Sequence, residues 1–529
     1  MNSVRIPAQA RPQVVGLVAL AALLVPLIFA LFTAHVWEDY YITLRSSRNL
    51  VQGAGLVFQP GERLHTFTSP VGVLVPAACL WLAQGSDAGA LWLFRAVCAL
   101  TLASAAGLLW QRTTECGLGP VGKLVLFGLW LADPKLADFA SNGMETSLLV
   151  ALLVLLWSEW ERPAGARPRR LALLYAGLMW TRPDAFILAG VLTAAQLFPG
   201  RRPASLLATA GRGILWGALL YLPWLLWSWY YFGSFIPHTI VAKATQTPPL
   251  LLSNVALVPL RSLVGHSMLE YLFLPANYLF GGWPHELRLG ARVLSVIAAF
   301  GWLVPGWAAP GRRASLALFA GSFYFCSINL YAWYVPPWTL LAALALAFAA
   351  DHAHRRLAAS ARPYWGRVVR LAAMSVVVVQ LCLLAAVAWQ MRVQQRVIED
   401  GGRREIGEWL RTHAATGDTV FLESLGYIGY FSGMKTYDFP GLSSREVTAA
   451  IAGGARRYVD VIQVLEPDWL VLRPVEVARE GLLDSTTLAG YELVKTWDAR
   501  PALDSIALLP GREWLMYDTV FLVYRKMKP

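Results

Sequence analysis

The sequence predicts a polytopic α-helical membrane protein that carries a small soluble α/β domain at its C-terminus. Of its 529 residues, 57% are hydrophobic and only 15% are charged, whereas about a quarter of the residues in a soluble domain are charged. Long apolar runs recur along the chain and end near residue 390. These observations predict a transmembrane domain over residues 1–390 and a soluble domain over residues 391–529.

Topology explains the formal net charge of +12 better than nucleic-acid binding does. The basic residues gather in short loops between apolar runs, such as Arg167, Arg169 and Arg170, or Arg312 and Arg313. An excess of Lys and Arg is typical of the cytoplasmic loops of membrane proteins. We therefore expect contact with membrane lipid and no nucleic-acid partner.

The same basic loops fix the predicted orientation, with the N-terminus in the cytoplasm and the soluble domain outside. A short apolar run at 70–83 is placed in the outer interface, because a crossing there would put Arg112 and Lys123 outside. About eleven spans then alternate consistently, at 13–33, 89–110, 121–133, 146–159, 171–181, 184–198, 213–231, 290–308, 314–330, 335–350 and 367–390.

The soluble domain shows both helical and strand patterns. Residues 403–413 have the period of an amphipathic helix. Three apolar stretches bounded by turn residues predict strands, at 418–422, 469–472 and 519–524.

Unusual polar side chains collect at the predicted outer ends of the spans and in the outer loops, whereas the inner loops are short and basic. This one-sided placement predicts a functional site that faces outward. The candidate residues are Glu38, Asp39, Arg45, Arg48, His65, Arg95, Glu145, Arg182, Asp184, His238, Lys243 and Tyr334.

These residue types suit transfer of a sugar from a lipid phosphate. A carboxylate such as Asp39 at the mouth of a helix bundle can take a proton from a hydroxyl nucleophile. Arg and Lys can hold a phosphate, Arg through a bidentate fork and Lys as a point charge. The sequence has no Asp-x-Asp, Walker or His/Cys zinc pattern, so no metal ligand is assigned and assistance by a divalent metal is left open.

Seven of the candidates also have a purely structural interpretation that the sequence leaves open. These interpretations are neutralisation of the acidic pair for Arg45 and Arg48, a local ion pair for Arg182 and Asp184, a helix cap for Glu145, a surface position for His65 and a snorkelling side chain for Lys243.

An ordered set of short motifs resembles the bacterial GT-C glycosyltransferases, and among them the terminal arabinofuranosyltransferases of actinobacterial cell-wall arabinan synthesis. The resemblance covers most of the chain. The motifs are Trp37-Glu38-Asp39-Tyr40-Tyr41-Ile42-Thr43, Thr66-Phe67-Thr68-Ser69-Pro70, Asn142-Gly143-Met144-Glu145-Thr146, Thr181-Arg182-Pro183-Asp184, Ile236-Pro237-His238-Thr239 with Ala242-Lys243, and Gly426-Tyr427-Ile428-Gly429-Tyr430-Phe431-Ser432-Gly433.

The resemblance implies the GT-C fold in a bacterial inner membrane, with an outward active site. It also implies a polyprenyl-phosphate sugar donor, with arabinofuranose as one possible sugar, and a cell-envelope glycan or glycolipid as acceptor. Displacement would be inverting, with a first-loop carboxylate as base. We assign that role to Asp39, with Glu38 positioning or substituting for it, and Arg182, His238 and Lys243 become candidates for contacts to the donor.

Two other classes of protein compete with the transferase. A transporter or flippase of lipid-linked sugars should carry polar groups at mid-membrane and often has inverted repeats, and the sequence shows neither. A glycan-binding scaffold with an inactive site would not need the intact pair Glu38 and Asp39.

Overall fold

The computed structural model describes residues 11–198, 203–245, 257, 269–275, 283–326, 331–483 and 485–527. The chain divides into two compact units, and neither is continuous in sequence. The helical unit comprises Met1–Phe32, Arg95–Pro223 and Leu250–Ala388. The sheet unit comprises Thr33–Phe94, Trp224–Pro249 and Trp389–Pro529.

The helices of the helical unit are long and apolar. Four of them, α1, α4, α10 and α16, continue into the sheet unit at one end. The helices are α1 (Pro12–Thr33), α4 (Asp87–Glu115), α5 (Pro120–Leu131), α6 (Pro134–Phe139), α7 (Thr146–Trp160), α8 (Pro168–Thr181), α9 (Ala185–Ala194), α10 (Pro203–Phe232), α13 (His285–Phe300), α14 (Ala309–Phe325), α15 (Val335–Ala358) and α16 (Tyr364–Gln394).

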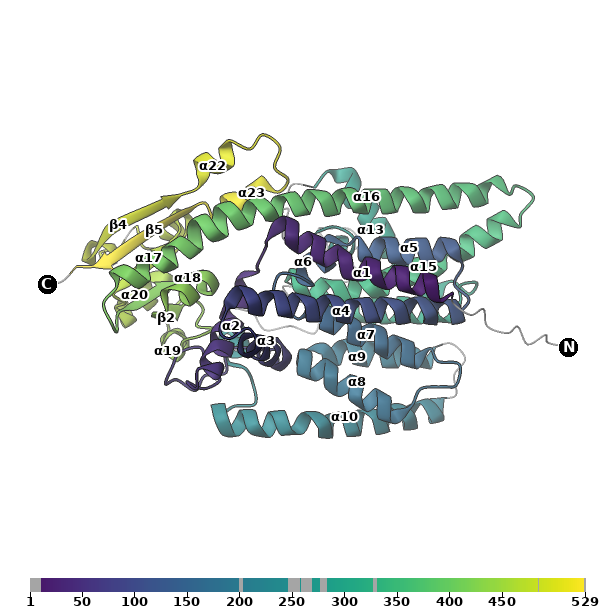
Figure 1. Ribbon diagram of the computed structural model, residues 1–529, viewed down its shortest axis with the longest axis horizontal. Helices are drawn as coiled ribbons and strands as arrows, with labels where there is room; N and C mark the ends of the chain where they lie inside the picture. Colours follow the sequence, from purple (N-terminus) through teal and green to yellow (C-terminus); the bar gives the residue numbers. More distant parts are fainter. Residues whose placement is uncertain are drawn as a thin grey trace. The chain divides into compact units, whose positions relative to one another are not determined.

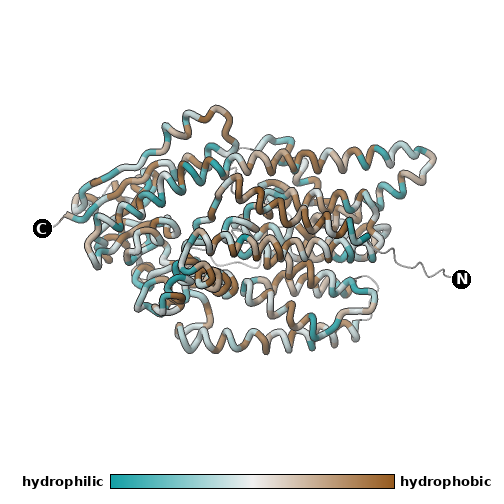
Figure 2. Tube along the Cα trace, in the orientation of Figure 1, coloured by the Kyte–Doolittle hydropathy of each residue, from teal (hydrophilic) through white to brown (hydrophobic). Residues whose placement is uncertain are grey.

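Within the described residues, five helical stretches are long and apolar enough to cross a membrane. They are Pro12–Thr33, Asp87–Glu115, Pro203–Phe232, Ala332–Ala358 and Tyr364–His413. Figure 2 shows hydrophobic residues along α1, α4 and α16, with hydrophilic residues at the turns between helices. The chain is therefore a multi-pass membrane protein, and the predicted count of about eleven spans stays a prediction.

Helix α15 is the core of the helical unit, because its side chains are buried from Val335 to Phe348. It packs against α5 and α14. Glycines permit the close approach: a methyl group on Gly321 of α14 would overlap the ring of Trp338, and one on Gly311 would overlap Phe348. Small residues serve this purpose in membrane helix pairs. Helices α7, α8 and α9 also lie side by side (Figure 1).

The sheet unit combines short helices with one five-stranded sheet. Its helices are α2 (Glu38–Val51), α3 (Pro70–Leu82), α11 (His238–Ala244), α17 (Glu405–His413), α18 (Leu425–Ser432), α19 (Arg445–Ala452), α20 (Tyr458–Leu465), α21 (Pro474–Arg479), α22 (Arg500–Asp504) and α23 (Arg512–Met516). A π-helix over Gln395–Arg404 joins α16 to α17, and π-helical turns are rare and often occur at functional sites.

The strands are β1 (Thr419–Leu422), β2 (Lys435–Asp438), β3 (Trp469–Leu472), β4 (Tyr491–Asp498) and β5 (Val520–Lys526). Their order in the sheet is β2-β1-β3-β5-β4. The first three are parallel, and β5 pairs antiparallel with both β3 and β4. The central strand β3 is buried along its whole length, which fits a continuous apolar sequence covered on both faces.

The alternation of side chains along β1 builds two cores. Phe421 packs on one face with α19 and α20, while Val420 and Leu422 pack on the other face with α17. The second core also contains Ile42 of α2 and Phe58, which lie nearly 400 residues before the sheet in sequence. The first loop region is therefore part of the core of the sheet unit.

Sequence patterns predicted several of these elements. The three expected strands are confirmed as β1, β3 and β5, and the expected helix at 403–413 is confirmed as α17. The segment 34–88, expected as one long outer segment, holds the two helices α2 and α3. The division into 1–390 and 391–529 stays a prediction, since residues 33–94 and 224–249 belong to the same compact unit as the C-terminal segment.

We predict that Gly321→Ala lowers the melting temperature of the purified protein by several degrees. The added methyl group forces Trp338 to move, and overpacking of this kind costs about 1–3 kcal/mol. The matched control is Gly190→Ala in α9, where no atom lies within 4 Å of the new methyl group. The control should match or exceed the wild type, because alanine favours a helix over glycine; equal melting temperatures for the two variants would contradict the packing argument.

Candidate functional site

The acidic pair Glu38 and Asp39 occupies the first turn of α2. Residues 34–37 are non-helical and separate α2 from the end of α1 at Thr33. The pair therefore begins a second helix and does not end the first. Negative side chains are favourable here, because the helix dipole leaves partial positive charge at the N-terminus. Asp39 is partly exposed.

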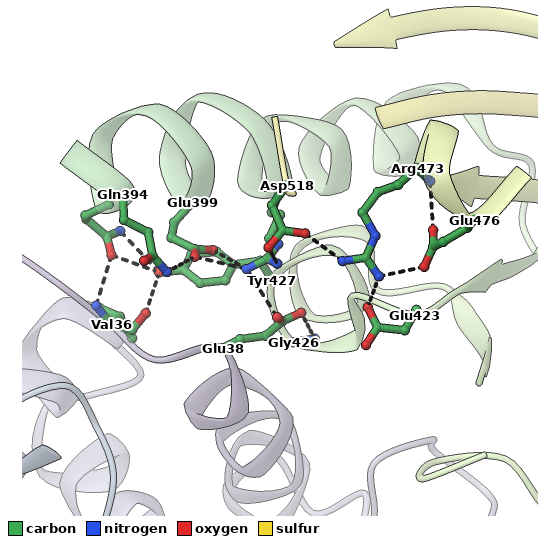
Figure 3. A network of polar contacts seen from close by, with 12 residues as sticks. Val36, Glu38, Gln394, Glu399, Glu423, Gly426, Tyr427, Arg473, Glu476 and Asp518 are labelled. Atoms are coloured by element: carbon green, nitrogen blue, oxygen red, sulfur yellow. Dashed lines mark hydrogen bonds and ion pairs between the residues drawn. The ribbon is translucent and has the colours of Figure 1, made fainter. Parts of the chain in front are cut away.

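Glu38 is held by the C-terminal part of the sheet unit. Its Oε1 atom accepts a hydrogen bond of 3.1 Å from the backbone N–H of Gly426, at the start of α18. Its Oε2 atom lies 3.2 Å from Nη1 of Arg403 in the π-helix. Figure 3 shows Glu38 directed toward Gly426 and a wider network of charged side chains.

Arg403 links several acidic residues in this network. It pairs with Glu399 at 3.0 Å and with Asp518 at 2.8 Å, in addition to Glu38. The other oxygen of Asp518 lies 2.6 Å from Arg473. Arg473 also pairs with Glu423 and with Glu476. The network thus joins α2, the π-helix and the end of the chain.

The network contains five carboxyl groups and two guanidinium groups, so full ionisation would leave excess negative charge. Burial raises the pKa of Glu38 to about 8, and the neighbouring carboxylates of Glu399, Glu423 and Asp518 add to this effect while Arg403 opposes it. Burial acts on Asp518 in the same direction, but its two arginine partners hold its pKa below the usual range. The surroundings of Glu38 therefore favour its protonated form.

Helix α2 runs parallel to α18, and its second anchor is Arg45. Arg45 donates to the carbonyl of Gly429 at 2.6 Å and to that of Met434 at 3.0 Å, at the C-terminal end of α18. Its side chain is buried and lies over the ring of Phe58, 4.4 Å from the ring centroid. Between the two anchors, Tyr41 packs on Tyr427, Tyr430 and Phe431. Arg45 thus stabilises the helix pair and is directed at backbone carbonyls.

Glycine is needed where the two helices meet. A methyl group on Gly426 would overlap the backbone carbonyl of Glu38.

Arg48, one turn after Arg45, forms an ion pair with Asp87 and lies over the ring of Tyr430. Tyr430 donates to the same carboxylate at 2.8 Å.

His65 is a core residue, so the surface interpretation is wrong. It is 3% exposed, stacks on Phe232 with a centroid distance of 4.5 Å, and its Nδ1 lies 3.2 Å from Ser228 Oγ. Burial lowers its pKa to about 4, which keeps the imidazole neutral.

His238 lies beside His65 at the start of α11. Its backbone N–H donates to the carbonyl of His65 at 2.8 Å, and its Nε2 lies 3.4 Å from Thr448 Oγ of α19. Lys243 is in the last turn of the same short helix and is half-buried. The sheet unit thus collects the acidic pair, Arg45, Arg48, both histidines and Lys243.

The remaining candidates belong to the helical unit, and four of them form one cluster. Arg182 lies 3.2 Å from Glu145 and 3.2 Å from Asp184, with its guanidinium 4.0 Å from the ring centroid of Tyr334. Glu145 is at the start of α7 without a capping hydrogen bond, so pairing with Arg182 replaces the expected cap. Together with Tyr324, three of these residues line a small cavity.

Arg95 also belongs to the helical unit but makes a different contact. Its Nε donates to the carbonyl of Ser141 at 2.6 Å, and the residue is buried. In the described portions of the chain, no three His, Cys, Asp or Glu residues are grouped as metal ligands.

Sequence patterns missed the charged network around Arg403. Arg403, Arg473 and Asp518 lie far apart in the chain and in unremarkable polar surroundings. The one local signal is the run Glu399-Asp400-Gly401-Gly402-Arg403-Arg404, which is polar directly after a long apolar helix.

Comparison with known proteins gives two kinds of similarity. Residues 388–522 match a family model described as a domain of unknown function (DUF8728). A relative from Mycobacterium tuberculosis, named terminal beta-(1->2)-arabinofuranosyltransferase, is 29% identical over 232 residues, covering 39% of this chain and 34% of the relative. One of the same name from Corynebacterium glutamicum is 31% identical over 241 residues, covering 40% of this chain and 33% of the relative. The chain thus spans about a third of the length of these curated relatives.

The similarity of structure extends over almost the whole chain. The structure of ArnT from Cupriavidus metallidurans, bound to undecaprenyl phosphate, superimposes with a TM-score of 0.55 and 12% sequence identity. The superposition covers 97% of this chain and 98% of that chain. The likeness shows a shared fold, including both the bundle and the C-terminal segment.

We predict that the stabilising effect of Glu38→Gln grows with pH. Because the pKa of Glu38 rises from its ordinary 4.5 to about 8 on folding, the folded state holds a proton that the unfolded state releases between these values. The wild type therefore loses stability as pH rises through this window, and the glutamine variant does not.

The measurement is the melting temperature of both proteins from pH 5 to 9. The difference, variant minus wild type, should increase up to about pH 8 and then level off. Asp498→Asn is the control, since Asp498 is solvent-exposed and its pKa is lowered by Arg500, which predicts a constant difference over the same range. A flat difference for Glu38→Gln would show that its carboxyl group ionises normally.

Proposed function

We propose that this chain, which has the GT-C fold and resembles terminal arabinofuranosyltransferases in sequence, is a membrane glycosyltransferase. Its donor is a polyprenyl-phosphate sugar, with arabinofuranose the sugar suggested by the relatives' names. Its acceptor is a hydroxyl group of a cell-envelope glycan or glycolipid. The undecaprenyl phosphate bound to the structural neighbour supports a lipid phosphate as the leaving group.

The proposal assigns the base to Asp39, and the observation that carries this assignment is how Glu38 is held. Glu38 already accepts a hydrogen bond from Gly426 and pairs with Arg403. Successive residues of a helix point about 100° apart, from 3.6 residues per turn. Asp39 therefore leaves α2 in a different direction from its neighbour, and both residues are partly exposed.

In the proposed step, a carboxylate oxygen of Asp39 takes the proton of the acceptor hydroxyl. The oxygen of the acceptor hydroxyl attacks the anomeric carbon of the donor sugar. The bond from that carbon to the phosphate oxygen breaks, and polyprenyl phosphate leaves with the electron pair. A single displacement inverts the anomeric configuration. Phosphate is a good leaving group, so the reaction needs a base more than an acid.

Within the sheet unit, Lys243 is assigned to the donor phosphate, because it is a cation at the end of α11. Within the helical unit, Arg182 is already paired with Glu145 and Asp184, so a contact from this cluster to the donor stays a prediction. A divalent metal and its ligands stay open.

A lipid-linked sugar could also be moved across the membrane without reaction. The observation that favours transfer is the similarity in sequence to two proteins named terminal beta-(1->2)-arabinofuranosyltransferase. The experiment below separates the two functions, since transport without transfer would leave the acceptor unlabelled.

We predict that Asp39→Asn lowers transfer by about a hundredfold or more, the size expected for loss of a general base. The assay uses the reconstituted full chain, a radiolabelled polyprenyl-phosphate arabinofuranose and a synthetic arabinofuranoside acceptor. Asp498→Asn, on the exposed face of β4, is the matched control and should retain wild-type turnover. Full activity of Asp39→Asn with loss in Glu38→Gln would transfer the role of base to Glu38.

We further predict that the C-terminal segment lies on the outer side of the membrane. A cysteine at Leu508, which is 86% exposed, should react with a membrane-impermeant thiol reagent in intact cells. Ala164→Cys lies in the basic loop after α7 and should react only after lysis. The reverse pattern would place the site on the cytoplasmic side.

A further inference from the structure

A groove in the helical unit contains none of the candidate residues of the proposed transferase site. It is lined by Leu108 and Arg112 of α4, Leu155, Ser158 and Glu159 of α7, and Arg170, Leu173 and Leu174 of α8. Its cavity volume is about 210 Å³, and the groove is open to the surroundings. Sites that enclose a whole small ligand occupy about 300–1,000 Å³, so this groove can hold only part of a lipid.

The walls of the groove are apolar and face outward from the helices. Leu155 is 38% exposed and Leu173 is 64% exposed. Both lie within a few turns of the loop between α7 and α8. An acyl chain is a suitable partner for such leucines, because lipid tails are as apolar as leucine.

Two polar atoms of the groove are buried without a hydrogen-bond partner. They are Nε of Arg112 and Oγ of Ser158, and Ser158 is only 2% exposed. A buried donor without a partner costs about 1–3 kcal/mol. Both donors therefore lack an acceptor, which is a role that the oxygen atoms of a ligand can fill.

The charges at the rim favour an anion. Glu159 is already neutralised, because it pairs with Arg162 and Arg170 and accepts a hydrogen bond from the backbone N–H of Arg167. Arg112 pairs with Glu115 through Nη1, which leaves its Nε without a partner. Arg170 keeps 55% of its side chain exposed. The stretch 159–170 contains four arginines against two glutamates. Basic pockets between membrane helices are the usual sites for anionic lipid headgroups.

We propose that this groove binds an anionic phospholipid. Its phosphate accepts hydrogen bonds from Arg112 and Arg170, an oxygen of its glycerol region bonds Ser158, and one acyl chain lies along Leu155 and Leu173. Phospholipid fits better than free phosphate, because free phosphate would leave the leucines uncovered. The site is independent of the proposed glycosyl transfer.

The experiment uses the full purified chain in lipid nanodiscs and in detergent. In native mass spectrometry with equal amounts of dioleoylphosphatidylglycerol and dioleoylphosphatidylcholine, the wild type should retain one phosphatidylglycerol molecule preferentially. The double variant Arg112→Gln/Ser158→Ala should retain it about tenfold less well, which is the effect of one charge-assisted hydrogen bond.

Arg169→Gln is the matched control, since it removes one charge from the same loop but does not line the groove. It should retain the lipid as the wild type does. Melting curves report whether the double variant is folded, and phosphatidylglycerol should raise the melting temperature of the wild type more than phosphatidylcholine does.

Three results would overturn the proposal. The wild type could retain phosphatidylglycerol and phosphatidylcholine equally. The folded double variant could keep the preference, or Arg169→Gln could lose it as strongly, which would indicate a general attraction of the loop for anions. A stabilisation reproduced by inorganic phosphate would assign the site to a free anion.

Discussion

The pairing of α2 with α18 is the contact on which the arrangement of the sheet unit depends. The two helices are parallel, so their dipoles point the same way and would repel if nothing else acted. Glu38 places a carboxyl group at the N-terminus of α18, and Arg45 places a guanidinium at its C-terminal carbonyls. Each side chain thus bonds a backbone group near its end of α18, and the aromatic contacts of Tyr41 fill the space between them.

The charged network around Arg403 extends this contact. Its burial costs solvation free energy, which its ion pairs and hydrogen bonds must offset. Charges removed from water lose solvation, and a buried ion pair is stable only when its hydrogen bonds are complete. Asp518 has one oxygen on Arg403 and the other on Arg473, so it remains ionised. Glu38 shares Arg403 with two other carboxylates, and its pKa rises instead. Two nearby acids therefore differ in protonation because their arginine partners differ in number.

The strands that the sequence predicted correctly are those whose burial leaves a local pattern of apolar residues. The apolar stretches at 469–472 and 519–524 become the adjacent strands β3 and β5, because buried strands need continuous or alternating apolar residues. Strand β4 escaped prediction, since it is mostly exposed and forms an edge of the sheet. Strand β2, with the sequence Lys435-Thr436-Tyr437-Asp438, is short and polar and forms the other edge of the sheet, so it too lacks an apolar pattern.

The candidate site was predictable in its composition and much less in its contacts. The acidic pair at Glu38 and Asp39 stands out because charge follows directly after an apolar helix. The partners of Glu38 lie at residues 403 and 426, and no periodicity connects positions so far apart. Arg45 shows the limit clearly: its charge suggested a ligand contact, whereas burial and four backbone or amide oxygens account for its donors.

The acidic pair and the C-terminal segment also form one folding unit, which constrains how the site can be built. Ile42 lies one turn after the pair, and its side chain belongs to the same core as Val420 and Trp469. Removing residues 389–529 would expose this face of α2 and release both of its anchors on α18. The direction in which Asp39 points is therefore set by residues nearly 400 positions away, and the C-terminal segment contributes to the site through the placement of α2.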